Sequence, residues 1–428
     1  MHRTSPLVLT ALGLGVHGCQ GEPASPTHMV RDSAGVTIVE SLDPAWRAGL
    51  GWRVAETPSV SIGVTGGDPR YELFQPRSAL KLSDGRIVIG NNGTREIRYY
   101  DAAGTHLLDV GGRGGGPGEF GRLDWVGKLP GDSVFVYDQT LRRITVFDPA
   151  GDHIRDISLQ QRDTRFFPVV RGRLSEDTYL GALTLRRNND DLPTGLVRDS
   201  VMLLSFDGWG QLLDTIGVFP NRTRDVQTRA IGERRIRGPA DVAFSPRFVW
   251  TVTADRIYAG NSQEYEIRTY SEDGELRRLI RREHEPVPIT RGDQERLVQE
   301  WRDIWYDRLD NPEIQWVLHS LEESHLPPSF PAFDPQVLDE TGRRVGASLL
   351  VDSEANLWVA EYRPPSEDTP RWSVFDRNGR WLGEIAFPER FVVTDIGTDY
   401  VMGWWRDDLG VESVMLYDLI KPETSDRG

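Results

Sequence analysis

Short runs of alternating apolar and polar residues recur along most of the chain, and the clearest copy lies within residues 110–151. There a Gly/Pro-rich stretch leads into an apolar run at 133–138, and a second alternating run at 143–148 closes with Phe-Asp-x-x-Gly. A period of two is typical of β-strands with one buried face. The Asp can hydrogen-bond the backbone two residues on and the Gly tolerates a positive φ, so the motif predicts a hairpin turn.

Six copies of this turn can be aligned, which indicates an internal repeat. They are Tyr100-Asp101…Gly104, Phe147-Asp148…Gly151, Phe206-Asp207…Gly210, Tyr270-Ser271…Gly274, Phe375-Asp376…Gly379 and Tyr417-Asp418, the last without its glycine. A strand is also predicted ahead of each motif, at residues 86–90, 133–137, 178–181, 248–253, 356–360 and 400–404. Repeats of roughly 40–50 residues are typical of solenoids, propellers and arrays, and a unit of four short antiparallel strands is a propeller blade. We therefore expect an all-β fold, a six-bladed β-propeller over residues 51–420.

Residues 287–326 break this alternation and predict a small α-helical hairpin inserted in the propeller. Thr290 with Asp293 is typical of a helix N-cap, and Asn311 followed by Pro312 is typical of a second helix start. Apolar residues at helical spacing follow the first cap, namely Leu297, Trp301, Ile304 and Trp305. The hairpin could be a lid over the channel, a docking surface or a packing buttress, and its apolar stripe favours the buttress.

The best copy of the repeat resembles the NHL-repeat and related six-bladed β-propeller family. The resemblance rests on Gly116-Pro117-Gly118-Glu119-Phe120, Val134-Phe135-Val136-Tyr137-Asp138 and Arg143-Ile144-Thr145-Val146-Phe147-Asp148. It is strong over residues 110–157, fair over 75–110 and 347–387, and weak elsewhere. The resemblance also implies an enzymatic alternative, because some six-bladed propellers are calcium-dependent lactonases or esterases and the NHL fold hosts a metal-dependent lyase.

The N-terminus carries the pattern of an export signal. An apolar run at residues 7–16 follows Arg3 and ends at Val16-His17-Gly18-Cys19. The run is too short to span a bilayer but fits the core of a signal peptide, and the junction resembles a bacterial lipobox. We expect residues 1–18 to be a lipoprotein signal peptide, Cys19 to be lipidated, and residues 19–50 to form a tether and N-terminal segment. By the same resemblance, Gln20 favours anchoring in the outer membrane of a Gram-negative bacterium, with no other contact to the membrane.

Charge and residue usage argue against several classes of function. The formal net charge of −15 argues against a nucleic-acid partner, because phosphate binding needs a basic surface. Lysine occurs only at positions 81, 128 and 421, which leaves almost no candidate for Schiff-base or P-loop chemistry. No G-x-S-x-G or H-x-x-x-H motif occurs, and the G-x-G-x-x-G at 116–121 leads into a strand instead of a helix.

Two sets of residues are candidates for a binding site. Alignment places Arg77, Trp125, Asp241 and Asp334 at the channel mouth, where propellers usually bind ligands. A second set, expected in a loop before the fourth blade, is an arginine cluster at positions 222, 224, 229, 234, 235 and 237. Arginine forks suit carboxylates and phosphates, so Arg234, Arg235 and Arg237 are candidate anion-binding residues. Blade packing is the structural alternative for the first set, and a solvated loop is the alternative for the second.

The favoured hypothesis is a monomeric, surface-tethered and non-catalytic propeller that binds a glycan, a peptide or an envelope protein without a cofactor. The alternative is a metal-dependent hydrolase, lactonase-like or lyase-like, with Ca²⁺ held at the channel mouth. Its ligands would come from Asp124, Asp241 and Asp334, with Asn91 or Asn92. A third interpretation is a scaffold in an envelope complex. The fold alone does not choose among these functions, and the sequence identifies no catalytic residue.

Overall fold

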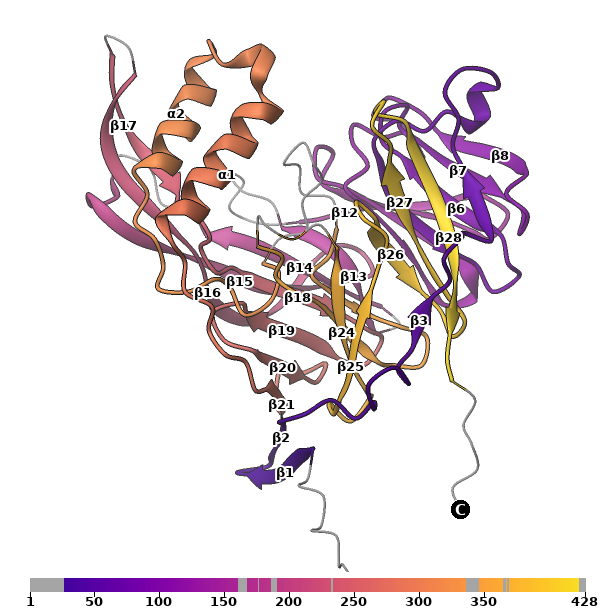
Figure 1. Cartoon of the computed structure of the whole chain (residues 1–428). Coiled ribbons are helices and arrows are strands. Elements are labelled where there is room, and N and C mark those ends of the chain that lie inside the picture. Colours follow the sequence, from indigo (N-terminus) through magenta and orange to yellow (C-terminus); the bar gives the residue numbers. More distant parts are fainter. Residues whose placement is uncertain are drawn as a thin grey trace, which may run out of the picture.

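The computed structural model describes residues 27–160, 168–175, 177–185, 191–231, 234–335, 346–364, 367 and 369–422, and its strands form six sheets (Figure 1). Sheet 1 contains β5 (Pro76–Lys81), β6 (Ile87–Asn91), β7 (Glu96–Tyr100) and β8 (His106–Gly111). Sheet 2 contains β9 (Trp125–Lys128), β10 (Val134–Asp138), β11 (Arg143–Phe147) and β12 (His153–Ser158). Sheet 3 contains β13 (Val169–Ser175), β14 (Thr178–Leu185), β15 (Gly195–Asp207), β16 (Leu212–Ile231) and β17 (Arg234–Asp241).

The other three sheets are built in the same way, and their strands are again named from the innermost strand outward. Sheet 4 contains β18 (Phe248–Val252), β19 (Ile257–Asn261), β20 (Glu266–Tyr270) and β21 (Leu276–Arg282), extended by β2 (Val36–Ser41) and β1 (His28–Ser33). Sheet 5 contains β22 (Leu349–Val351), β23 (Leu357–Ala360), β24 (Arg371–Phe375) and β25 (Trp381–Ala386). Sheet 6 contains β26 (Val392–Ile396), β27 (Tyr400–Arg406) and β28 (Glu412–Ile420), which pairs with β3 (Arg53–Val54) and β4 (Val60–Ile62). Short 3₁₀ helices lie at Pro69–Tyr71, Pro130–Asp132 and Tyr306–Arg308.

The six sheets close into a ring. The first strand of each sheet contacts the first strand of the next, from β5 through β9, β13, β18, β22 and β26 back to β5. Apolar side chains fill the space between neighbouring sheets; for example, Leu80 and Val88 of sheet 1 pack with Val126 and Val136 of sheet 2. Stacking small antiparallel sheets around a ring in this way buries both faces of each sheet. The predicted all-β propeller is confirmed.

The turn motif has the predicted geometry. The Asp101 carboxylate accepts hydrogen bonds from the backbone N–H groups of Ala103 (2.9 Å) and Thr105 (2.7 Å), and Gly104 has φ +85°. The same pair of backbone bonds forms at Asp148, Asp207 and Asp376. These turns join the third and fourth strands of their sheets, because an Asp side chain and a left-handed glycine together close the hairpin.

One turn prediction needs correction. Tyr417 and Asp418 do not begin a turn, since both lie inside β28. No glycine is needed there because the outer strand of sheet 6 is β4, which comes from the N-terminal part of the chain. The strand predicted at residues 248–253 is present as β18, the first strand of sheet 4, and β19 lies between it and the strand that ends at the turn motif.

Residues 28–62, here called the N-terminal strap, contact three sheets in succession. β2 runs parallel to β21 and extends sheet 4. The backbone N–H groups of Ala45 and Trp46 then donate to the carbonyls of Trp381 (3.1 Å) and Leu382 (2.8 Å) in sheet 5. β4 finally pairs with β28 and buries Ile62, which is 1% exposed. The strap therefore closes the ring without a covalent link.

The predicted helical hairpin is present as α1 (Arg291–Ile304) and α2 (Pro312–Glu322). Thr290 and Asp293 form a reciprocal capping box, and the Asn311 side chain accepts from the Glu313 N–H at 2.8 Å. The apolar faces of the helices meet over Ala243, and α2 contacts β16 and β17. In Figure 1 the hairpin stands beside the raised end of β17.

In the described part of the chain, neither helix has the length and apolar character needed to cross a bilayer. The expected signal peptide at residues 1–18 and the lipidation candidate Cys19 lie outside the described residues.

Candidate functional site

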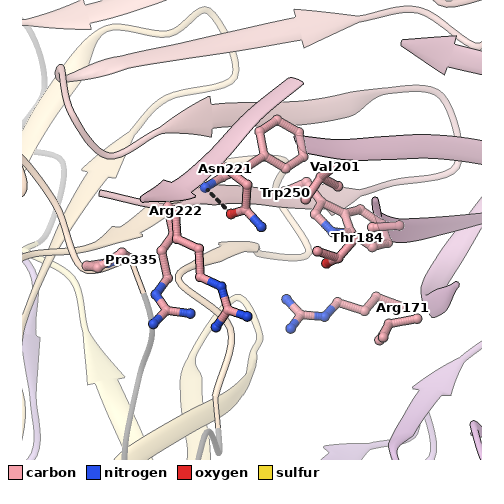
Figure 2. A pocket seen from close by; sticks show the side chains of 11 residues that line it. Arg171, Thr184, Val201, Asn221, Arg222, Trp250 and Pro335 are labelled. Atoms are coloured by element: carbon pink, nitrogen blue, oxygen red, sulfur yellow. Dashed lines mark hydrogen bonds between the residues drawn. The ribbon is translucent and has the colours of Figure 1, made fainter. Parts of the chain in front are cut away.

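A cavity of about 190 Å³ lies where the first strands of sheets 3 and 4 begin (Figure 2). Three arginines line it, namely Arg171 of β13, Arg222 of β16 and Arg247 just before β18. The other lining residues are Val169, Ala182, Thr184, Val201, Asn221, Phe248, Trp250 and Pro335. None of these described lining residues is a carboxylate. We call this cavity the arginine pocket.

Arg171 is held by aromatic rings from the two neighbouring sheets. Its guanidinium carbon lies 5.5 Å from the ring centre of Trp125 and 5.9 Å from that of Trp250. Cation–π contacts of this kind stabilise by about 0.5–1 kcal/mol each where the site is exposed, and by more where water is excluded. Figure 2 shows the Arg171 and Arg222 side chains extending toward the same space. The two indole contacts therefore orient the Arg171 guanidinium before any ligand arrives.

Arg222 and Arg247 are oriented by a shared carboxylate. The Asp241 Oδ2 atom accepts from Arg222 at 2.7 Å and from Arg247 at 2.8 Å. Burial lowers the pKa of the Arg247 guanidinium, and the charge of Asp241 opposes this shift. Arginine nevertheless stays protonated at neutral pH, because its ordinary pKa lies above 12.

A second carboxylate supports Arg222 from behind the pocket. Asp199, whose side chain is 3% exposed, lies 3.4 Å from Arg222 Nε. It also accepts from Arg224 at 3.0 and 2.6 Å, and that pair is buried. Buried charges are tolerated when they are paired and hydrogen-bonded. The pocket thus presents guanidinium groups whose supporting carboxylates lie outside its lining.

Two of the four channel-mouth residues predicted from the sequence contact the arginines of this pocket. Trp125 contacts Arg171, and Asp241 binds Arg222 and Arg247. Asp334 precedes the lining residue Pro335, and its backbone N–H donates to the Ala360 carbonyl at 2.8 Å. Arg77 lies on β5 in sheet 1 and acts electrostatically on Asp124. Trp125 and Asp241 thus each contact arginines of the pocket, whereas Arg77 is not among the residues that line it.

The arginine cluster does not form a loop, contrary to expectation. Arg222, Arg224 and Arg229 lie in β16, and the acidic partners of Arg224 and Arg229 are Asp199 and Asp225. The anion candidates Arg234, Arg235 and Arg237 lie in β17, paired with Ile231, Ala230 and Thr228. The residues at 235 and 237 are exposed, and Arg237 donates to the Leu192 carbonyl at 2.5 Å. Their anion-binding role stays a prediction.

The residues considered for a calcium site have local structural partners. Asp124 accepts from the Gln139 N–H at 2.8 Å, and burial raises the pKa of its carboxyl group. The side-chain oxygens of Asn91 and Asn92 accept from the backbone N–H groups of Phe74 and Leu123. Within the described ranges, no group of three or more His, Cys, Asp or Glu side chains is arranged to hold a metal ion.

No protein-family model and no curated protein sequence matches the chain. By structure it is similar to a DUF4221-family member from Bacteroides vulgatus, with a TM-score of 0.49 and 11% identity over 87% of this chain and 99% of that one. It is also similar to a predicted exported protein from Bacteroides fragilis, with a TM-score of 0.45 and 12% identity over 90% and 99% of the two chains. A streptogramin B lyase has a TM-score of 0.38 and 10% identity over 87% and 100%. These likenesses concern the fold alone, and the propeller assignment rests on the sheet order and the closed ring of contacts.

Arg171 and Arg247 were not singled out in the sequence. Neither belongs to the arginine cluster, and each lies far in sequence from the other arginines that line the cavity. They meet only because β13 and the start of β18 are neighbours in the ring. The molecule that results is a β-propeller with an arginine-lined pocket on one face.

Proposed function

We propose that this chain is an exported, lipid-anchored propeller of six NHL-like blades that binds an acidic ligand in the arginine pocket without transforming it. The ligand is a carboxylate-bearing part of a glycan, a peptide or an envelope protein. The observation that carries the proposal is the convergence of Arg171, Arg222 and Arg247 on one cavity, in a protein with a formal net charge of −15. Arginine forks bind carboxylates through two parallel hydrogen bonds.

The pocket is preorganised for this role. Trp125 and Trp250 contact Arg171, while Asp241 holds Arg222 and Arg247. Groups fixed in this way lose little conformational entropy when a ligand binds. The acidic ligand therefore meets guanidinium groups that already face the cavity.

The size of the pocket suits one charged group better than a whole ligand. Its volume of about 190 Å³ is below the range of about 300–1,000 Å³ that is usual for complete small-molecule sites. A single sugar acid, or one acidic side chain of a longer chain, is small enough to enter a cavity of this volume. The proposal therefore favours a macromolecular ligand that inserts one acidic residue.

Binding of small acids tests the proposed function. Millimolar glucuronate or N-acetylglutamate should raise the melting temperature, because a ligand that binds only the folded state stabilises it. Arg171→Gln should weaken this binding about tenfold, which corresponds to about 1.4 kcal/mol. Glucose and N-acetylglutamine are the neutral controls, and Arg268→Gln, on the exposed part of sheet 4, is the control variant. If neither acid shifts the melting temperature more than its neutral control, the proposed function is wrong.

The lipid anchor has its own test. The motif Val16-His17-Gly18-Cys19 supports the anchor. A clickable fatty acid fed to expressing Gram-negative cells should label the protein, and Cys19→Ala should abolish the label and release the protein from the membrane fraction. A variant that keeps both the label and the membrane association would contradict the anchor.

A further inference from the structure

The paired strands β16 and β17 have two distinct faces above the pocket. Side chains alternate between the faces of a strand, and directly paired residues share a face. Residue pairs Thr228↔Arg237 and Ala230↔Arg235 therefore lie on one face, and Gln227↔Gly238 and Arg229↔Ile236 lie on the other. The register between the two strands is regular throughout, so this division holds along all of β17.

The helical hairpin covers one of these faces. The guanidinium carbon of Arg229 lies 5.2 Å from the Trp316 ring centre on α2. A Cβ atom on Gly238 would lie 3.6 Å from the same indole. Arg229 also pairs with Asp225, which lies 3.8 Å from His325 Nδ1 just beyond α2. The part of this face around Arg229 and Gly238 is thus occupied by the protein itself, whereas Ile236 further along β17 is 39% exposed.

The opposite face leads to Asp241, which holds two arginines of the pocket. Asp241, at the end of β17, binds Arg222 and Arg247, and residues 235, 237 and 241 share a face by parity. At about 3.3 Å per residue, Arg237 lies roughly 13 Å and Arg235 roughly 20 Å from Asp241 along the strand. Both arginines are exposed. We call Arg235 and Arg237 the arginine strip.

β17 is also the last strand of sheet 3 among the described residues. Its outer edge pairs with no described strand. The strand contains Pro239, and proline is found in edge strands because it has no backbone N–H to donate. An extended peptide can add to such an edge as a further strand. Its alternate side chains would then stand about 6.6 Å apart, the same spacing as Arg235 and Arg237.

We propose that β17 docks an extended acidic peptide segment of a partner protein. Acidic side chains two residues apart meet Arg235 and Arg237, and a further acidic group enters the arginine pocket. This inference rests on the proposed function for the pocket and extends it to a class of partner. An acidic peptide fits better than an acidic glycan because its backbone amides can continue the sheet and its side chains share the spacing of the strip.

Three probes distinguish this proposal from its alternatives. They are N-acetylglutamate, a peptide of about ten residues with Glu at every second position, and an oligouronate of equal charge; ten residues suffice to span roughly 20 Å beyond the pocket. The peptide should bind at least tenfold more tightly than N-acetylglutamate. Arg235→Ala combined with Arg237→Ala should remove this gain, because the additional contacts are lost, while binding of N-acetylglutamate persists.

The matched control is the double variant Arg256→Ala with Arg277→Ala, which removes two exposed arginines, one in the turn before β19 and one in β21. This control variant should still bind the peptide more tightly than N-acetylglutamate. If it does not, net charge alone sets the affinity, and the proposed role of the arginine strip is wrong. Equal affinity for the peptide and for N-acetylglutamate would contradict docking on the arginine strip and would leave the proposed function unaffected. A gain for the oligouronate without a gain for the peptide would replace the peptide partner by a glycan. Failure of all three probes to bind would overturn the proposed function itself.

Discussion

Sheets 2 and 3 are neighbours in the ring and differ sharply in how they are stabilised. In sheet 2, every residue of β10 and β11 is buried between the flanking sheets. In sheet 3, β15 and β16 reach 13 and 20 residues, and their far ends extend beyond the depth that neighbouring sheets can cover. The extension is held by ion pairs, Asp199 with Arg224 and Asp225 with Arg229, and by contact with α2.

Charged side chains have different roles in the two sheets. Arg143 of sheet 2 donates to the backbone carbonyls of Gly115, Gly116 and Glu119, and so fixes the loop that leads into the sheet. The charged groups of sheet 3 are arranged around a cavity instead. Where the chain leaves the regular ring, charged side chains take over from apolar packing, and the same side chains form the candidate site.

The largest expected difference between the two sheets concerns their carboxylates. Asp199→Asn should destabilise the protein by about 3 kcal/mol, because it leaves the buried Arg224 without its charge partner. The matched change in sheet 2 is Asp156→Asn, whose partner Arg143 keeps its backbone acceptors. That change should cost under about 1 kcal/mol. Urea unfolding of both variants measures the two free energies.

Equal costs for the two substitutions would show that the ion pairs of sheet 3 behave as exposed pairs do. The contrast between the sheets would then rest on strand length alone. A cost for Asp199→Asn that falls steeply at high salt would contradict a buried pair as well, since salt weakens exposed pairs more than buried ones.

A smaller difference is expected in the response to pH. The hydrogen bond from the Thr290 hydroxyl lowers the pKa of Asp293, so the folded protein favours the ionised carboxylate. The stability this group contributes is present above its unfolded pKa of about 3.9 and is lost as pH falls through the folded pKa. Amide exchange in residues 291–304, corrected for intrinsic rates, should therefore speed up below about pH 4, while β10 and β11 stay protected.

Asp293→Asn is the control for this pH effect. It should weaken the capping box by about 1 kcal/mol at neutral pH and remove the acid-dependent part of the exchange. If the variant keeps the full pH dependence, another carboxylate controls the hairpin. If β10 and β11 lose protection over the same range, the hairpin and sheet 2 open as one unit.

Local chemistry made much of the fold predictable. Asp101 and Gly104 act within five residues, and so do Thr290 and Asp293, so their turn and cap could be recognised from the sequence. Ring closure could not be recognised from the sequence, because β3 and β4 have only two and three residues and show no alternation of apolar and polar positions. The pocket was equally hidden. Trp125 and Asp241 could be placed near the channel by alignment, but Arg171 and Arg247 become neighbours only through the packing of sheets 3 and 4.

The N-terminal strap has a mechanical consequence. Tension applied at Thr27 acts first on the hydrogen bonds that Thr27 accepts from Leu42, Asp43 and Arg380, and then on the pair His28↔Ser41 at the outer end of the β1–β2 register. β1 therefore unzips pair by pair before the load reaches the parallel pairing of β2 with β21, and the pairing of β4 with β28 comes later still along the chain. A pull on this end of the molecule therefore releases β1 before it strains the ring of sheets.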